Sequence, residues 1–115
     1  MTEPPDSTDR ILTALATTIR ERRDASAGQS YTRSLLDGGP RRCAKKFGEE
    51  AVELVIAATG EDDAAVRAEA ADVLYHLLVL IEARAVPLAE VLGELARRTG
   101  VSGHEEKARR PQSST

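Results

Sequence analysis

Apolar residues separated by three or four positions mark the first element that this chain can form. Near the N-terminus they are Ile11, Leu12, Leu15 and Ile19. This spacing predicts an amphipathic helix over about residues 8–24, with Ser7 or Thr8 as its cap. The 115 residues are rich in Ala and Leu and include only three aromatic side chains, which favours packed helices over a sheet.

Proline and glycine delimit three further helices. Pro40 and Pro87 suit the first turn of a helix, whereas Gly60 and Gly100 are typical of helix ends. The segment 30–36 is too short and polar to be assigned. The three predicted helices cover about residues 40–59, 63–85 and 87–98.

These elements predict an all-α fold, a chain of four to five helices that forms a helical bundle over residues 8–100. Such a short chain buries only a small core. Between Val73 and Ile81 the predicted helix is apolar around most of its circumference, so we expect a homodimer to complete the bundle. Residues 1–7 are expected to be disordered, and the charged tail 101–115 to be loosely ordered.

Composition excludes several classes of protein. The formal net charge of −3 does not indicate a nucleic-acid-binding chain. Cys43 is the only cysteine, which rules out an internal disulfide and a cysteine-based zinc site. No apolar run is long enough to span a membrane and no signal peptide is apparent, so we expect no membrane association and a cytoplasmic location.

Acidic residues cluster on two of the predicted helices. Glu49, Glu50 and Glu53 share one helix face, and Glu69 and Asp72 share another. If the two helices form an antiparallel hairpin around Gly60, the two faces meet and the five carboxylates form a cage. The sequence therefore predicts a site for a divalent cation, and Mg²⁺ is the expected ion because it prefers oxygen ligands.

The competing interpretation is that each acidic face is only the solvated side of a helix. The face that carries Glu69 and Asp72 continues into Val79, Leu80 and Ala83, so we expect it to point inward. Buried like charges destabilise a protein unless a cation neutralises them. This favours the metal site.

Basic residues precede the acids on the same helix. Arg42 and Lys46 lie two turns and one turn before the glutamates on the same stripe, and Lys45 is adjacent to Lys46. Ordinary pairing four residues apart, Lys46 with Glu50 and Lys45 with Glu49, is compatible with substrate binding. A cation site beside several basic groups suits a polyphosphate. His76 lies one turn from the acids and is a candidate substrate contact, with a purely structural role as the alternative.

Four stretches of this sequence resemble one family. Residues 45–53 read KKFGEEAVE, residues 69–78 read EAADVLYHLL, and SYTRSLL and EEKA occupy 30–36 and 105–108. They resemble the phosphoribosyl-ATP pyrophosphatase family of the all-α nucleoside-triphosphate pyrophosphohydrolase (MazG-like) superfamily, whose shared pattern is EExxE followed by ExxD. Phe47 departs from the usual smaller aliphatic residue, which should alter packing and leave the chemistry unchanged.

The resemblance implies a function in histidine biosynthesis. Phosphoribosyl-ATP would be hydrolysed to phosphoribosyl-AMP and pyrophosphate by a Mg²⁺-dependent homodimer, and the product would pass to a separate cyclohydrolase. Lys45 and Lys46 would contact phosphates, with Arg33 as a weaker candidate. The residues that match the family's metal-binding and catalytic acids are Glu49, Glu50, Glu53, Glu69 and Asp72.

Three rival interpretations remain at this point. A housekeeping pyrophosphohydrolase of the same superfamily would act on ordinary nucleoside or deoxynucleoside triphosphates. A non-enzymatic helical dimer would bind metal without turnover. A carboxylate-bridged di-iron bundle needs Glu-x-x-His motifs, and it is discounted because Val73 and Val101 stand three residues before His76 and His104.

Overall fold

The computed structural model describes residues 10–24 and 30–100, which form five α-helices and no strand. The predicted all-α fold is therefore confirmed. The terminal segments 1–7 and 101–115 and the predicted caps at residues 7 and 8 lie outside the described residues. The helices are α1 (Ile11–Arg22), α2 (Tyr31–Asp37), α3 (Gly39–Gly60), α4 (Asp63–Ala83) and α5 (Leu88–Thr99).

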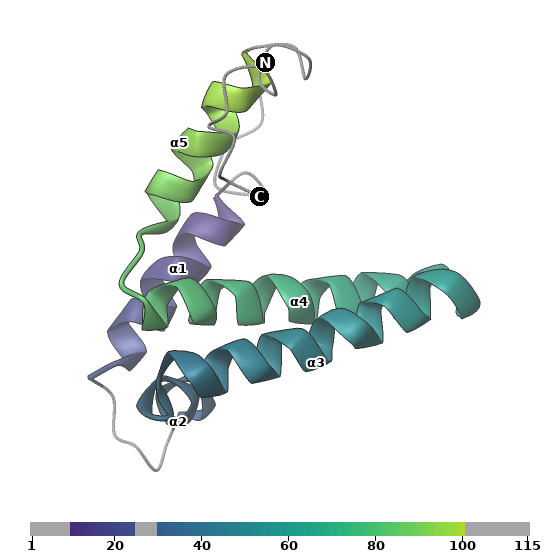
Figure 1. Ribbon diagram of the computed structural model, residues 1–115, viewed down its shortest axis with the longest axis horizontal. Coiled ribbons are helices and arrows are strands. Elements are labelled where there is room, and N and C mark those ends of the chain that lie inside the picture. The colour runs from purple at the N-terminus through teal and green to yellow at the C-terminus, as the bar shows by residue number, and fades with distance from the viewer. Residues whose placement is uncertain (1–9, 25–29, 101–115) are drawn as a thin grey trace, which may run out of the picture.

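The two long helices α3 and α4 lie side by side and antiparallel, and together they form an extended hairpin (Figure 1). A very short connection joins them, and the Asp62 side chain caps α4 by accepting a hydrogen bond from the Ala65 backbone N–H at 3.0 Å. Glu61 and Asp62 have extended backbone, which ends α3 and reverses the chain. The hairpin predicted around Gly60 is thus present.

Helices α1 and α2 pack at the base of this hairpin, where the apolar core lies. The buried core residues are Ile19, Leu35, Cys43, Leu78 and Val79. Cys43 is a structural residue here, since its thiol donates a hydrogen bond to the Leu35 carbonyl at 3.3 Å. Burial raises the pKa of this thiol. The core thus joins α1, α2, α3 and α4 at one end of the hairpin.

An ion pair holds the end of α1 to the end of α4. The Arg23 guanidinium contacts the Glu82 carboxylate at 2.6 Å and also donates to the Glu82 backbone carbonyl. Glu82 is mostly covered, with a side chain that is 14% exposed. This contact ties the two elements together beside the core.

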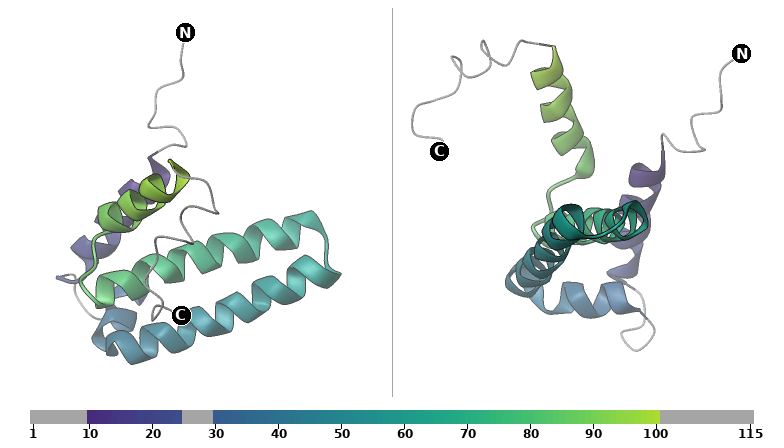
Figure 2. Two further views of the ribbon diagram at one scale, coloured as in Figure 1. Left: turned by 45° about the horizontal axis from the view of Figure 1, so that its top comes forward. Right: turned by 90° about the vertical axis from the view of Figure 1, so that its right-hand side faces the viewer.

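Helix α5 leaves the hairpin and points away from it, and only its first turns lie near α1 (Figure 2). None of its residues is buried, although its sequence is strongly amphipathic. Leu92 and Leu95 are among its exposed apolar side chains. Beyond Leu88, which packs against the core, most of the apolar face of α5 is left uncovered by the described part of this chain.

The unassigned segment 30–36 forms the cap and most of helix α2. Its first turn is fixed by Ser30, whose hydroxyl accepts a hydrogen bond from the Arg33 backbone N–H at 3.1 Å. The helix ends at Gly38, and Gly39 follows with a φ of +81°, a conformation that glycine adopts without steric cost. Only seven residues long, α2 carries too few periods for its sequence to reveal it.

The C-terminus of α4 contains the one non-glycine residue with positive φ among the described residues, Ala85 at 59°. The Val86 N–H donates to the Ile81 carbonyl and the Ala85 N–H to the Glu82 carbonyl, both at 2.9 Å. This is the hydrogen-bond pattern of a Schellman motif, in which glycine is the usual residue at the position of Ala85.

We expect Ala85→Gly to stabilise the protein by about 0.5–1 kcal/mol, because it relieves the left-handed strain at the cost of some unfolded-state entropy. Chemical denaturation measures the change. Ala68→Gly, at an exposed position inside α4, is the control and should destabilise by about 1 kcal/mol. A lower free energy of unfolding for Ala85→Gly would contradict this account of the turn.

Candidate active site

The antiparallel packing of α3 and α4 brings three of the five predicted carboxylates together. One oxygen each of Glu50, Glu69 and Asp72 lies within 4.8 Å of the others. Glu50 comes from α3, while Glu69 and Asp72 come from successive turns of α4. We call these three residues the acidic cluster.

The expectation that the acids point inward is only partly right. Glu50 and Glu69 are half-buried, but Asp72 is exposed, as are Glu49 and Glu53. Solvent therefore reaches the cluster through Asp72. Within the single chain the site is an open one.

Mutual repulsion acts on the acidic cluster. Partial burial, followed by the charges of Asp72, Glu53 and Glu50, raises the pKa of Glu69. Glu53 lies outside the trio, yet it contributes to the field at Glu69. The charges that raise the pKa of Glu69 are all negative, so the cluster favours a bound cation.

Lys46 connects the acidic cluster to a neighbouring basic surface. Its ammonium lies 3.5 Å from the Glu50 carboxylate and 3.9 Å from that of Glu49. Tyr31 and then Glu50 raise the pKa of Lys46, so this side chain stays charged. The predicted ion pairing of Lys46 is present, and it places the cation beside the acids.

A groove of about 380 Å³ opens next to Lys46, between α2 and the first turns of α3. We call it the basic groove because three of its six lining residues are cationic. Glu49 lies at its junction with the acidic cluster. The lining residues are Tyr31, Leu35, Arg42, Lys45, Lys46 and Glu49.

His76 lies between the groove and the cluster, but its ring is buried, with 6% of the residue exposed. It packs edge-on against Tyr75, with ring centroids 4.9 Å apart, and against Tyr31 at 6.2 Å. Burial lowers the pKa of His76, so the imidazole is neutral at neutral pH. The hydroxyl of Tyr75 is hydrogen-bonded to Thr32 of α2.

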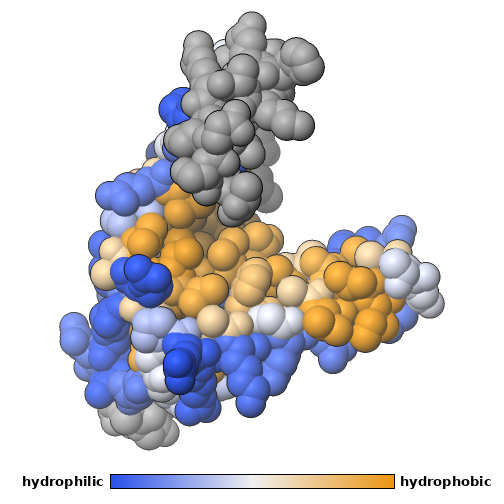
Figure 3. Space-filling view, in the orientation of Figure 1, coloured by the Kyte–Doolittle hydropathy of each residue, from blue (hydrophilic) through white to orange (hydrophobic). Residues whose placement is uncertain are grey.

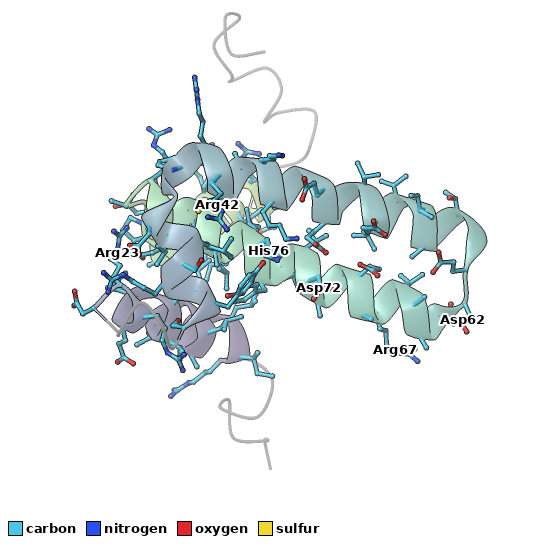
Figure 4. The ribbon with its side chains drawn as sticks, turned by 90° about the horizontal axis from the view of Figure 1, so that it is seen from below. Arg23, Arg42, Asp62, Arg67, Asp72 and His76 are labelled. Atoms are coloured by element: carbon cyan, nitrogen blue, oxygen red, sulfur yellow. The ribbon has the colours of Figure 1, made fainter. Side chains whose placement is uncertain are left out.

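Labelled side chains show how the site is laid out along the hairpin. Arg42, His76, Asp72 and Asp62 follow one another from its base to its tip (Figure 4). The predicted substrate residues Arg42, Lys45 and Lys46 therefore share the basal side of the acids. Arg33 lies elsewhere: it pairs with Asp37 at 3.0 Å and does not line the groove.

Tyr31 and Leu35 line the groove and were absent from the residues predicted for the site. Their only sequence signal was the stretch 30–36, which distinguished one family from its wider superfamily without indicating a role. Both project from α2, whose position against α3 depends on tertiary packing. Helical spacing within α3 revealed the cations but not the aromatic ring opposite them.

Fold and site together define an all-α protein with a carboxylate cluster suited to a divalent cation and an adjoining groove suited to phosphate groups. Comparison with known proteins narrows this class. A family model described as phosphoribosyl-ATP pyrophosphohydrolase matches residues 12–99. The chain belongs to this family.

Curated relatives extend the match over nearly the whole chain. A protein of Azorhizobium caulinodans named phosphoribosyl-ATP pyrophosphatase is 58% identical over 108 residues, which cover 93% of this chain and 99% of the relative. Proteins of the same name from Dinoroseobacter shibae and Cereibacter sphaeroides are 56% and 55% identical; each alignment covers 87% of this chain and 98% or 97% of the relative. The predicted family resemblance is confirmed.

Replacing Glu69 tests the repulsion within the acidic cluster. The folded-state pKa of Glu69 is raised, so without metal its ionisation lowers the stability of the fold as the pH rises through that pKa. We expect Glu69→Gln to remove this loss, so that the metal-free variant melts at or above the parent temperature at neutral pH.

Added Mg²⁺ should raise the melting temperature of the parent and do so less for Glu69→Gln, since the shift depends on affinity for the folded state. Glu90→Gln, an exposed position on α5, serves as the control and should respond like the parent. An undiminished Mg²⁺ response in Glu69→Gln would show that this carboxylate binds no metal. Thermal melts between pH 4.5 and 8 provide both comparisons.

Proposed function

We propose that this protein hydrolyses phosphoribosyl-ATP to phosphoribosyl-AMP and pyrophosphate, a step of histidine biosynthesis, with Mg²⁺ as cofactor. The observation that carries the proposal is the continuity of the site: in a chain of this family, Lys46 joins the acidic cluster directly to the basic groove. A substrate that carries several phosphate groups and a bound cation needs both halves.

The acidic cluster fits Mg²⁺ by its donor set. It offers only carboxylate oxygens, and three donors from two helices leave room for the waters and phosphate oxygens that Mg²⁺ retains. Glu49 and Glu53 border the cluster and complete the proposed set of metal-binding acids. The bound ion would polarise the phosphoryl group under attack and neutralise the leaving pyrophosphate.

The chain's own residues would orient the substrate and handle the proton. Lys46, fixed between Glu49 and Glu50, presents its ammonium to phosphate oxygens at the edge of the cluster. A carboxylate of the site accepts a proton from the attacking water. His76 stays neutral and buried, so we propose that it supports the Tyr31 and Tyr75 rings and touches the substrate at most with one edge.

Substrate choice tests the assignment directly. Phosphoribosyl-ATP should be hydrolysed far better than ATP, dCTP or dUTP, with release of pyrophosphate and no orthophosphate. Equal turnover of an ordinary deoxynucleotide would support a housekeeping pyrophosphohydrolase, and metal binding without any turnover would support a non-enzymatic module.

Asp72→Asn should reduce the hydrolysis of phosphoribosyl-ATP by orders of magnitude, because the metal loses an anionic ligand.

We also propose that the protein is a homodimer. Large apolar side chains on the arm formed by α3 and α4 are more than two-fifths exposed. Apolar surface extends along this arm from the base of α5 (Figure 3). The expected interface helix α4 is partly covered within the chain, since Leu78 belongs to the core. The uncovered residues of the arm are Val52, Val55, Ile56 and Leu74.

Such a surface rarely stays exposed in a monomer, and a second copy offers the same apolar arm in return. We expect Val55→Asp to convert the dimer into a monomer, because it places a charge in a desolvated interface. Sedimentation at micromolar concentration measures the change, with Ala14→Asp on α1 as the control. A monomeric parent protein would refute the proposal.

A further inference from the structure

The basic groove contains two cations that the acidic cluster does not neutralise. Lys46 pairs with Glu49 and Glu50, whereas Arg42 and Lys45 have no acidic partner among the described residues. Both nevertheless line the same groove. The groove therefore retains unbalanced positive charge on the side away from the acids, which suits a second anionic group.

Local geometry turns Arg42 away from the acidic cluster. A Cβ atom added to Gly38 would lie 2.3 Å from Arg42 Cδ and 2.9 Å from Arg42 Cβ, so the arginine stem crosses the bare Cα of Gly38. Gly38 precedes Arg42 by one helical turn, and Glu50 follows it. The stem of Arg42 thus runs toward the start of α3, back toward α2.

The separation along α3 indicates two binding positions. Arg42 precedes Glu50 by eight residues, which corresponds to about 12 Å of helix rise. A single phosphate cannot contact both the Arg42 guanidinium and a cation at the acidic cluster over this distance. Figure 4 shows the same order, with Arg42 at the base of the hairpin, Asp72 toward its tip and His76 between them.

Tyr31 lies between these two positions. Its ring centroid is 6.2 Å from that of His76, and Tyr31 lines the groove together with Arg42. The residue is 55% exposed, which leaves an aromatic surface open to a ligand. Aromatic side chains of this kind stack on nucleotide bases. From the tip toward the base, the site offers carboxylates, an aromatic ring and then free cations.

Phosphoribosyl-ATP carries its charge in a matching order. Its triphosphate lies at one end, the purine base in the middle, and the 5′-phosphate of the added ribose at the other end. We propose that Arg42 and Lys45 bind this 5′-phosphate, and that they select phosphoribosyl-ATP over ATP. The inference rests on the proposed function, which assigns the triphosphate to the acidic cluster.

Arginine suits this role because its planar guanidinium forms paired hydrogen bonds with phosphate oxygens. The opposite orientation would place the pyrophosphate portion of the triphosphate in the groove. In that case Arg42 would serve every nucleoside triphosphate and would not distinguish ATP from phosphoribosyl-ATP. The two orientations make opposite predictions for ligands that carry only one end of the substrate.

Equilibrium binding of two nucleotides tests the proposal without turnover. AMP and phosphoribosyl-AMP differ only in the phosphoribosyl group, so calorimetric titration of both isolates the affinity that this group adds. We expect the parent to bind phosphoribosyl-AMP more tightly. Arg42→Gln should weaken phosphoribosyl-AMP roughly 10- to 100-fold, the range of a charge-assisted hydrogen bond, and leave AMP unchanged. Lys45→Gln should act in the same direction.

Arg41→Gln is the matched control, since Arg41 is an exposed neighbour that does not line the groove. It should bind both nucleotides like the parent. In steady-state assays, Arg42→Gln should raise KM for phosphoribosyl-ATP with little change in kcat. Far-ultraviolet circular dichroism and thermal melts confirm that each variant is folded.

Several outcomes would overturn the proposal. The first is equal affinity of the parent for the two nucleotides. The second is an unchanged phosphoribosyl-AMP affinity in Arg42→Gln. The third is that Arg42→Gln loses binding of Mg²⁺-pyrophosphate and keeps binding of phosphoribosyl-AMP. Failure of the proposed function is a separate result, because it appears as absence of phosphoribosyl-ATP hydrolysis by the parent protein. The binding difference between the two nucleotides is measured in either case.

Discussion

Packing of α3 against α4 is the interaction on which the rest of this structure depends. The core that secures it lies at the base of the hairpin, where Ile19 of α1 and Leu35 of α2 pack against Cys43, Leu78 and Val79. The Arg23–Glu82 ion pair closes the same end. Because the base is held firmly, the next turns of both helices are kept in register, and their carboxylates meet without any loop to position them.

The hairpin also places the repelling charges of the site close to the apolar core that stabilises the fold. Repulsion around Glu69 works against the fold, while the apolar core, about two to three helical turns further along α4, supplies the stability that tolerates it. Lys46 relieves part of the negative charge at Glu50. The remaining charge is available to a cation, and the unpaired cations of the groove are available to phosphate. The hairpin thus keeps the negative charge of the acidic cluster apart from the positive charge of the basic groove.

Features that depend on spacing within one helix could be predicted from the sequence. Glu50 and Lys46, or Glu69 and Asp72, lie on one face because they are three or four residues apart. Solvent exposure of Asp72 was not foreseen, since the apolar continuation of its face does not show where the partner helix ends. Tyr31 was missed because the approach of α2 to α3 is a contact between separate elements. The direction in which α5 leaves the hairpin could not be predicted from its amphipathic pattern either.

The sequence by itself determined the helical class, the approximate bounds of the long helices, the two acidic faces and the family to which the chain belongs. These follow from residue order, because the helical period and the turn chemistry at residues such as Gly60 are local properties. Only the tertiary structure decided which carboxylates meet and which cations stay unpaired. It also placed Tyr31 across from Arg42. Those relations depend on how separately formed helices pack, and packing is set by the combined shape of side chains that are distant in the chain.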